Sequence, residues 1–182
     1  EILEVAKQHP LDEWMTDAFN FAETRLTGNF LKTNKEELLA SHLKGADLEV
    51  FAKGKKIYET EGYCITCHQE SGTGLQKAGY PTLVGQEWVL GNEERLIKLA
   101  LHGLYGPMNI MGNHYKGQVP MMAFKGLLND DEIAAVLTYV RNSFGNKASV
   151  IDPDKVKEIR EATKDRNKFY TADELLQEHP MN

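Results

Sequence analysis

The residues with the most specific chemistry in this sequence lie in one short segment, Cys64-Ile65-Thr66-Cys67-His68. The segment holds both cysteines of the chain, and a histidine follows the second one directly. Cys-x-x-Cys-His is the pattern at which a c-type haem is attached. Two thiols at this spacing can each add to one vinyl group of the same porphyrin, and the imidazole that follows can ligate the iron. The segment therefore predicts a covalent haem site that includes Cys64, Cys67 and His68.

A Cys-x-x-Cys pair has two other uses, and both stay open at this point. A redox dithiol is expected within a βαβ pattern, which is not visible around this segment. A structural zinc site needs four ligands, but the chain has no third cysteine. A distant histidine would have to complete a set with Cys64, Cys67 and His68, and the spacing of that set is unlike a zinc finger.

Length and composition favour a soluble helical protein outside the cytoplasm, in the periplasm or a similar compartment. The chain has 182 residues, enough for one core of about 100 to 150 residues with extensions. Its net charge of −6 gives no basic excess, so nucleic acid is not an expected partner. No apolar run approaches the roughly 18 residues that cross a bilayer. Because the chain begins at Glu1 and shows no signal peptide, we expect a mature fragment or an excised module, with any export signal upstream.

Apolar spacing and capping signals predict an all-α chain in three parts. Residues 1–45 form a helical N-terminal extension, residues 46–149 form the domain that carries the haem segment, and residues 150–182 form a helical C-terminal extension. In the first part, Trp14 and Phe19 belong to a stripe of apolar residues at helical spacing, which is typical of a packed helix face.

The middle part should contain three helices joined by irregular, glycine-rich loops. The first helix spans about residues 46–60 and leads directly into the cysteine segment. The second begins at Asn92 and ends at Gly103, and the third begins at Asn129 and ends at Gly145.

The C-terminal extension carries capping signals for two further helices. Asp152 precedes a proline at the first helical position, and Thr171 precedes a glutamate at the spacing of a capping box. Because this extension is mostly polar, it is either a solvated helix or a cover over the core. We expect that the two extensions pack around the haem domain and shield part of the haem.

The order of these features resembles the class I cytochrome c family. The resemblance covers about residues 51–147 and rests on Gly54, Tyr58, Cys64, Cys67, His68, Pro81, Leu83, Gly85, Met121, Phe124 and Tyr139. It implies a cytochrome c fold, in which the helix before the haem crosses the last core helix. Gly54 and Tyr58 would then meet Val136 and Tyr139.

A narrower resemblance is to the haem-binding modules at the C-terminal end of large secreted dehydrogenase-like proteins. It rests on segments 80–89, 101–107 and 133–146, and segment 9–14 looks like the helical repeat that precedes such modules. The resemblance implies one covalent haem c in an electron carrier that is not itself an enzyme. Its partners would be a dehydrogenase or other donor and a respiratory acceptor. Two alternatives are a haem relay domain of a larger oxidoreductase, and a five-coordinate haem peroxidase or gas sensor.

The resemblance also implies that a methionine is the second axial ligand of the iron. The family takes this sulfur from the loop before the last helix, commonly as Met-Pro-x-Phe. Here the loop reads Val119-Pro120-Met121-Met122-Ala123-Phe124, so Met121 holds the matching place, three residues before the aromatic residue. Met122 stands where the family has proline and is the first alternative. The other candidates are Met108, Met111, His102 and His114, and for His102 the end of a helix should favour a positive charge.

Further residues are expected at the cofactor by the same resemblance. The Pro81 carbonyl should accept a hydrogen bond from the other ring nitrogen of His68, and Leu83 and Phe124 should contact the haem. Trp88 and Tyr115 either donate to the haem propionates or are ordinary core aromatics. A group of lysines either rings the exposed haem edge and steers an acidic partner, or is a solvated surface. These are Lys53, Lys55, Lys56, Lys77, Lys116 and Lys125.

Overall fold

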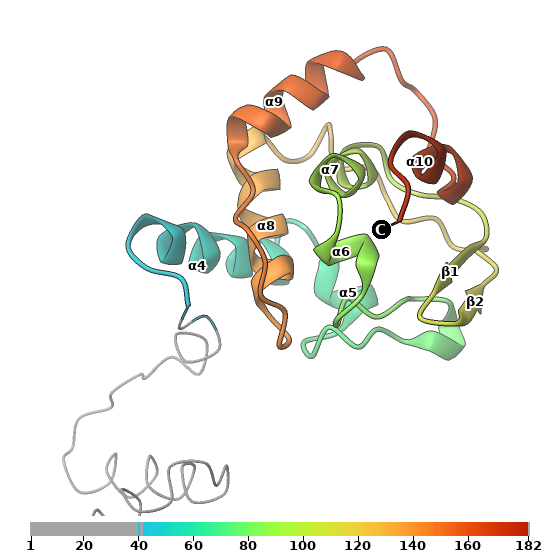
Figure 1. The fold of residues 1–182 in the computed structure, drawn as a ribbon, viewed down its shortest axis with the longest axis horizontal. Helices are drawn as coiled ribbons and strands as arrows, with labels where there is room; N and C mark the ends of the chain where they lie inside the picture. The colour runs from blue at the N-terminus through green and yellow to red at the C-terminus, as the bar shows by residue number, and fades with distance from the viewer. Residues whose placement is uncertain (1–39, 41, 182) are drawn as a thin grey trace, which may run out of the picture. The chain divides into compact units, whose positions relative to one another are not determined.

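The structure, a computed structural model, describes residue 40 and residues 42–181 of the chain. In this part, helices and one small antiparallel sheet make up the regular structure (Figure 1). The elements are α4 (Ala46–Glu59), α5 (Cys64–His68), the 3-10 helix η1 (Gln76–Ala78), α6 (Glu87–Leu90), α7 (Glu93–His102), β1 (Met108–Ile110), β2 (Asn113–Tyr115), α8 (Asp130–Asn142), α9 (Pro153–Ala162) and α10 (Ala172–Glu178). The predicted helices of the middle part and of the C-terminal extension are present. Most of the predicted N-terminal extension, with Trp14 and Phe19, lies outside the described residues.

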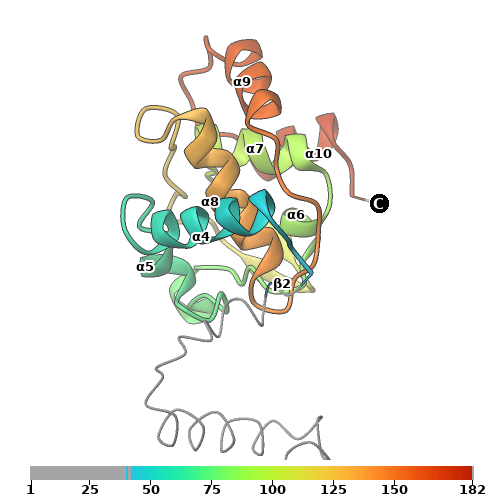
Figure 2. The ribbon, with the colours of Figure 1, turned by 90° about the vertical axis from the view of Figure 1, so that its left-hand side faces the viewer.

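Helices α4 and α8 cross in close contact, as Figure 2 shows. A methyl group on Gly54 would collide with the carbonyl oxygen of Ala135 and would stand 2.9 Å from Cβ of Tyr139. One turn later on α4, the ring of Tyr58 lies with its centroid 5.2 Å from that of Tyr139. The expected crossing is present, but Gly54 lies closest to Ala135 and Tyr139, while Val136 lines the pocket described below.

Helix α8 begins as expected and ends earlier than expected. At its start, Asn129 and Glu132 form a capping box, in which each side chain accepts a hydrogen bond from the backbone N–H of the other. At its end, the Asn142 side chain donates to the Thr138 carbonyl at 3.0 Å and accepts from the Ala148 N–H at 3.1 Å. Through these bonds Asn142 holds the C-terminal end of α8. The helix therefore ends at Asn142, three residues before Gly145, where the sequence analysis expected its end.

A short hairpin lies in a stretch that was expected to be irregular. Strands β1 and β2 pair with Ile110 opposite Asn113, so Met111 and Gly112 form the turn between them. Met111 has a φ angle of 49° and Gly112 one of 76°, which are the positive values of a type I′ turn. Neither strand is long enough to show an alternating pattern in the sequence, so the hairpin was missed.

The C-terminal extension covers the core rather than standing in solvent. Val156 and Ile159 of α9 belong to the main apolar cluster, with side chains of α4 and α8. Leu175 of α10 belongs to a second cluster, which also contains Trp88 and Leu99. Figure 1 shows α9 next to α8 and α10 next to α7. Of the two alternatives for this segment, the cover over the core is confirmed.

His102 ends α7 and lies between that helix and the C-terminal extension. Its side chain is 4 % exposed, its Nε2 lies 2.7 Å from Oγ1 of Thr163, and its ring meets that of Tyr170 edge to face. Burial, with the nearby charges of Lys125 and Arg166, lowers the pKa of His102 to about 4. The expectation that the helix end favours a charged His102 is wrong, because desolvation and the neighbouring cations outweigh the helix dipole.

The close approach at Gly54 predicts that Gly54→Ala destabilises the protein. The added methyl group would press on the backbone carbonyl of Ala135, which belongs to a packed helix and cannot rotate away. We expect a loss of about 1–3 kcal/mol in the free energy of unfolding, measured by denaturant titration of the haem-loaded protein. Gly126→Ala is the matched control, because a methyl group there meets nothing within 4 Å. An equal effect of the two substitutions would contradict the close-contact explanation.

The buried His102 predicts a pH dependence of stability. The unfolded chain takes up a proton at this residue below about pH 6.5, whereas the folded chain does so only below about pH 4. The free energy of unfolding should therefore fall as the pH falls from 6.5 to 4, and the contribution of His102 should become constant below that window. His102→Gln should flatten this part of a pH series of denaturant midpoints, with His114→Gln on the exposed hairpin as the control. An unchanged slope in His102→Gln would refute the assignment.

Candidate haem and metal site

Helix α5 is a single short turn that presents the haem segment on one face. Because Cys64, Cys67 and His68 are three and four residues apart, a helical turn places them side by side. The chain enters through Tyr63 with φ 48° and leaves through Gln69 with φ 66°, so left-handed residues isolate the turn at both ends. The Tyr58 hydroxyl on α4 donates to the Gln69 carbonyl at 2.7 Å and fixes the exit.

The two thiols differ in their surroundings. Cys64 lines the pocket, its Sγ lies 3.5 Å from the Gly62 carbonyl oxygen, and burial raises the pKa of its thiol to about 12. Cys67 is half-buried and lies outside the pocket wall. The pair is therefore placed with one sulfur in the pocket wall and one outside it.

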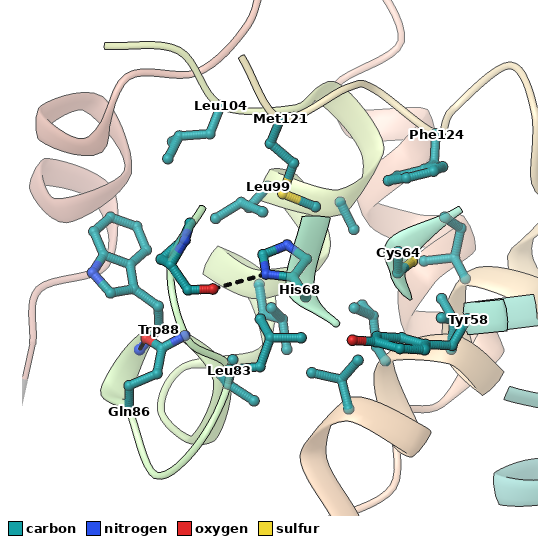
Figure 3. A pocket seen from close by; sticks show the side chains of 18 of the residues that line it. Tyr58, Cys64, His68, Leu83, Gln86, Trp88, Leu99, Leu104, Met121 and Phe124 are labelled. Atoms are coloured by element: carbon teal, nitrogen blue, oxygen red, sulfur yellow. Dashed lines mark hydrogen bonds between the residues drawn. The ribbon is translucent and has the colours of Figure 1, made fainter. Parts of the chain in front are cut away.

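His68 is held in the orientation that a metal ligand needs. Its Nδ1 lies 2.9 Å from the Pro81 carbonyl oxygen, as the sequence analysis expected (Figure 3). Since a carbonyl can only accept, Nδ1 carries the proton and Nε2 keeps its lone pair. Burial lowers the pKa of His68, although the bond to Pro81 acts in the opposite direction, so the imidazole stays neutral. A neutral imidazole with a fixed ring and a free Nε2 is the form that binds iron.

The loop that carries Pro81 is fastened at several points. The Leu83 N–H donates to the Gly72 carbonyl at 2.7 Å, and the Gln86 side chain donates to the Thr82 carbonyl at 3.2 Å. Asn146, just beyond α8, donates to the Leu83 carbonyl at 3.0 Å. These bonds explain why an irregular segment can hold one carbonyl oxygen steady beside His68.

His68 projects into a cavity that is lined by residues of α4, α5, α6, α7 and α8. Its walls are almost entirely aliphatic and aromatic. They consist of Tyr58, Cys64, His68, Pro81, Leu83, Gln86, Trp88, Val89, Leu96, Leu99, Ala100, Leu104, Met108, Ile110, Met121, Phe124, Leu128, Ile133, Val136, Leu137 and Val140. An apolar slot with one oriented imidazole and a cysteine sulfur in its wall fits a porphyrin that carries one iron.

Met121 lies in the same cavity as His68, and its side chain points into it (Figure 3). Its backbone pairs with Leu104: the Met121 N–H donates at 2.9 Å, and its carbonyl accepts at 3.2 Å. The first alternative, Met122, is 43 % exposed and is absent from the pocket wall. The structure thus brings Met121, rather than Met122, together with His68.

The remaining candidate ligands are placed less favourably, with one exception. Met108 on β1 lines the pocket, whereas Met111 at the hairpin turn is 67 % exposed. His102 is packed against the C-terminal extension, and His114 is exposed with its Nδ1 2.9 Å from Oδ1 of Asn109. Met108 is therefore the alternative to Met121 that the pocket itself offers.

The aromatic and apolar residues expected at the cofactor divide into two groups. Leu83, Trp88 and Phe124 line the pocket, as expected. The Trp88 indole N–H lies 3.4 Å from the Asn109 carbonyl oxygen, near the limit of a hydrogen bond. Tyr115 is buried beside Trp88 in the second cluster and does not line the pocket. Donation by Trp88 and Tyr115 to haem propionates stays a prediction.

The six lysines that were expected to ring the haem edge do not gather in one place. Three belong to α4, whereas Lys77 and Lys116 border a polar groove beside β2. Figure 1 shows α4 and β2 on opposite sides of the described part. The ammonium of Lys125 is bound internally, because it donates to the Arg166 carbonyl.

Sequence reasoning missed the part of the wall that comes from short elements. Gln86 and Val89 belong to the four-residue helix α6 or its cap, and Ile110 comes from the hairpin. The one available signal was Gln86 two residues before Trp88, since its side chain caps α6 by accepting the Trp88 N–H at 3.0 Å. Such a cap is not specific enough in a sequence to predict a helix.

Two negative findings concern the described residues, 40 and 42–181. No three histidine, cysteine, aspartate or glutamate side chains there gather closely enough to hold a metal ion, as the zinc alternative would need. In the same residues, every helix is too short or too polar to cross a bilayer.

Comparison with known proteins gives the family. The model of the cytochrome c family matches residues 51–144. Cytochrome c-552 of Thermus thermophilus is 34 % identical over 145 residues, which cover 78 % of this chain and 89 % of that protein. The fructose dehydrogenase cytochrome subunit of Gluconobacter japonicus is 32 % identical over 114 residues, 59 % of this chain and 22 % of that protein. The cytochrome c subunit of the quinone alcohol dehydrogenase of Gluconobacter oxydans is 31 % identical over 87 residues, 47 % of this chain and 17 % of that protein.

The matched range runs from α4 through the Cys-x-x-Cys-His turn to the end of α8, so it contains the elements that build the pocket. Because the family is defined by haem bound covalently at that turn, the dithiol and zinc alternatives are excluded. This chain belongs to the cytochrome c family and carries a covalently attached c-type haem with its iron.

Proposed function

We propose that this protein carries single electrons between a dehydrogenase or another donor and a respiratory acceptor, outside the cytoplasm. Cys64 and Cys67 would attach the haem, and His68 and Met121 would be the axial ligands of its iron. The observation that carries this proposal is that an oriented imidazole and a methionine thioether enter one apolar cavity. When bound, the haem supplies reversible one-electron exchange between ferric and ferrous iron.

The residues of the pocket would favour electron transfer over substrate chemistry. If His68 and Met121 both hold the iron, no position on it would remain open to a substrate. A thioether is a soft, neutral ligand that favours ferrous iron and raises the reduction potential. The bond from His68 to the Pro81 carbonyl acts in the other direction, because it makes the imidazole a stronger donor. The potential would therefore reflect a balance between these two contacts.

A second candidate function is an electron relay inside a larger oxidoreductase. It is supported by the two Gluconobacter relatives, which are named as cytochrome subunits of dehydrogenases and of which this chain spans only about a fifth. The intact mass of the native protein from its source separates the two. A polypeptide close to 20.5 kDa supports the free carrier, and a much larger one supports the relay domain.

The assignment of Met121 predicts a spectroscopic change in one variant. Met121→Ala should abolish the weak far-red sulfur-to-iron band of the oxidised protein. It should also lower the reduction potential by on the order of 0.1 V, part of the about 0.8 V range that axial ligands set. The band is measured by absorption and the potential by redox titration.

The matched control is Met122→Ala, the neighbouring and exposed methionine, which should keep both the band and the potential. Met108→Ala tests the other thioether in the pocket wall and should behave in the same way. If Met108→Ala lost the far-red band and Met121→Ala kept it, Met108 would be the sulfur ligand of the iron in place of Met121. A wild-type protein that is high-spin and binds carbon monoxide at once would instead favour the five-coordinate peroxidase or sensor.

A further inference from the structure

The backbone of Gly103, Leu104 and Tyr105 lies between two segments that are far apart in the sequence. On one side, Leu104 pairs with Met121 in antiparallel fashion. On the other side, the Tyr170 N–H donates to the Gly103 carbonyl at 3.1 Å, and the Tyr105 N–H donates to the Tyr170 carbonyl at 2.9 Å. The loop that carries Met121 and the C-terminal extension are thus joined through residues 103–105, called the central segment here.

This pairing is the main backbone tether of the Met121 loop. For residues 116–123, the two bonds between Met121 and Leu104 are the only backbone-to-backbone hydrogen bonds that the described chain forms outside helices and strands. The loop is fixed again only at Phe124, whose N–H donates to the Ala100 carbonyl at 3.0 Å. The position of Met121 therefore depends on how firmly Leu104 itself is held.

Residues 163–180 contain Tyr170 and lie on the side of Leu104 opposite Met121. This segment is called the C-terminal strap here. At its beginning, the Lys125 ammonium donates to the Arg166 carbonyl. At its end, the buried guanidinium of Arg95 donates to the carbonyls of His179 and Pro180 at 2.8 and 3.0 Å. Both anchors lie on the body of the domain, so the strap is tied down on either side of its contact with Leu104.

Tyr170 is the residue that presses the strap against the domain. It is 3 % exposed, its ring lies edge to face with His102, and the Arg166 guanidinium covers it at 3.5 Å from the ring centroid. A methyl group on Gly103 would collide with the Met121 carbonyl and stand 2.8 Å from the Phe169 ring. Strap, central segment and Met121 loop are therefore packed without space between them.

We propose that the C-terminal strap is a positioning device for Met121. By fixing Leu104 through Tyr170, it keeps the Met121 backbone in place and the thioether inside the pocket. This inference rests on the proposed role of Met121 as an axial ligand. The strap would act on how often the sulfur leaves the iron, and an external ligand such as cyanide can bind only when it has left.

The test is the rate at which the ferric, haem-loaded protein binds cyanide at saturating concentration, measured by stopped flow far below the unfolding transition. Tyr170→Ala should raise this limiting rate by about tenfold, the change that a loss of about 1.4 kcal/mol in holding the loop would produce. Arg166→Gln removes the cover of the Tyr170 ring from a more exposed site and should raise the rate in the same direction. If Tyr170→Ala does not fold, an unchanged rate in Arg166→Gln alone overturns the proposal.

Two controls separate positioning from general stability. Tyr170→Phe keeps the ring and the backbone bonds, so it should keep the wild-type rate. Val156→Ala opens a cavity under α9 at a residue that does not line the pocket, and should lower the unfolding midpoint without changing the cyanide rate. If Val156→Ala raised the limiting rate of cyanide binding as much as Tyr170→Ala, the strap would contribute only to general stability, and the positioning proposal would be refuted.

Failure of the strap and failure of the ligand assignment have different signatures. If Met121→Ala keeps the far-red band, the ligand assignment is wrong and the strap proposal falls with it. If Met121→Ala loses the band but Tyr170→Ala and Arg166→Gln keep the wild-type cyanide rate, the ligand stands and only the strap proposal is refuted.

Discussion

The close contact between α4 and α8 at Gly54 is the constraint on which the rest of the structure depends. The end of α4 leads into the turn that carries Cys64 and His68, and α8 supplies Ile133, Val136, Leu137 and Val140 to the pocket wall. A wider separation of the two helices would move the attachment point away from that wall. The absence of one side chain at residue 54 thus sets the width of the space in which the cofactor lies.

The site also shows how uncharged polar side chains can lie in the wall of a nearly apolar pocket. His68 is half-buried, and the Pro81 carbonyl satisfies its one N–H and leaves the other nitrogen for the metal. Gln86 is buried, and both ends of its side chain are used by the backbone, at Thr82 and Trp88. Since both of these side chains have a local partner, placing them beside the apolar cavity has little energetic cost.

The parts of this structure that could be predicted from sequence are those with a strong local signal. The cysteine spacing predicted the haem, the caps at Asn92 and Asn129 predicted the starts of α7 and α8, and the family resemblance predicted the bond between His68 and Pro81. What could not be predicted depends on contacts between distant segments. The neutral state of His102 follows from its burial beneath the C-terminal extension, where a helix end alone would suggest a charge.

Short elements were missed for a related reason. Helix α6 and the hairpin are each only a few residues long, so neither contains a full period of apolar spacing. Their positions are set by tertiary bonds, such as the one from the Arg141 guanidinium to the Val89 carbonyl at 2.7 Å. A buried arginine far along the chain is not visible as the partner of a short helix until the fold is known.

The placement of Cys64 has a consequence for the order of events during maturation. In the folded protein this sulfur lies against Gly62 in an apolar wall, where burial holds the thiol in its protonated, weakly nucleophilic form. Attachment is therefore favoured in a chain whose α8 and Met121 loop do not yet pack against α5. Folding completes around the attached cofactor, and an apoprotein that folded first would shield the sulfur it needs for attachment.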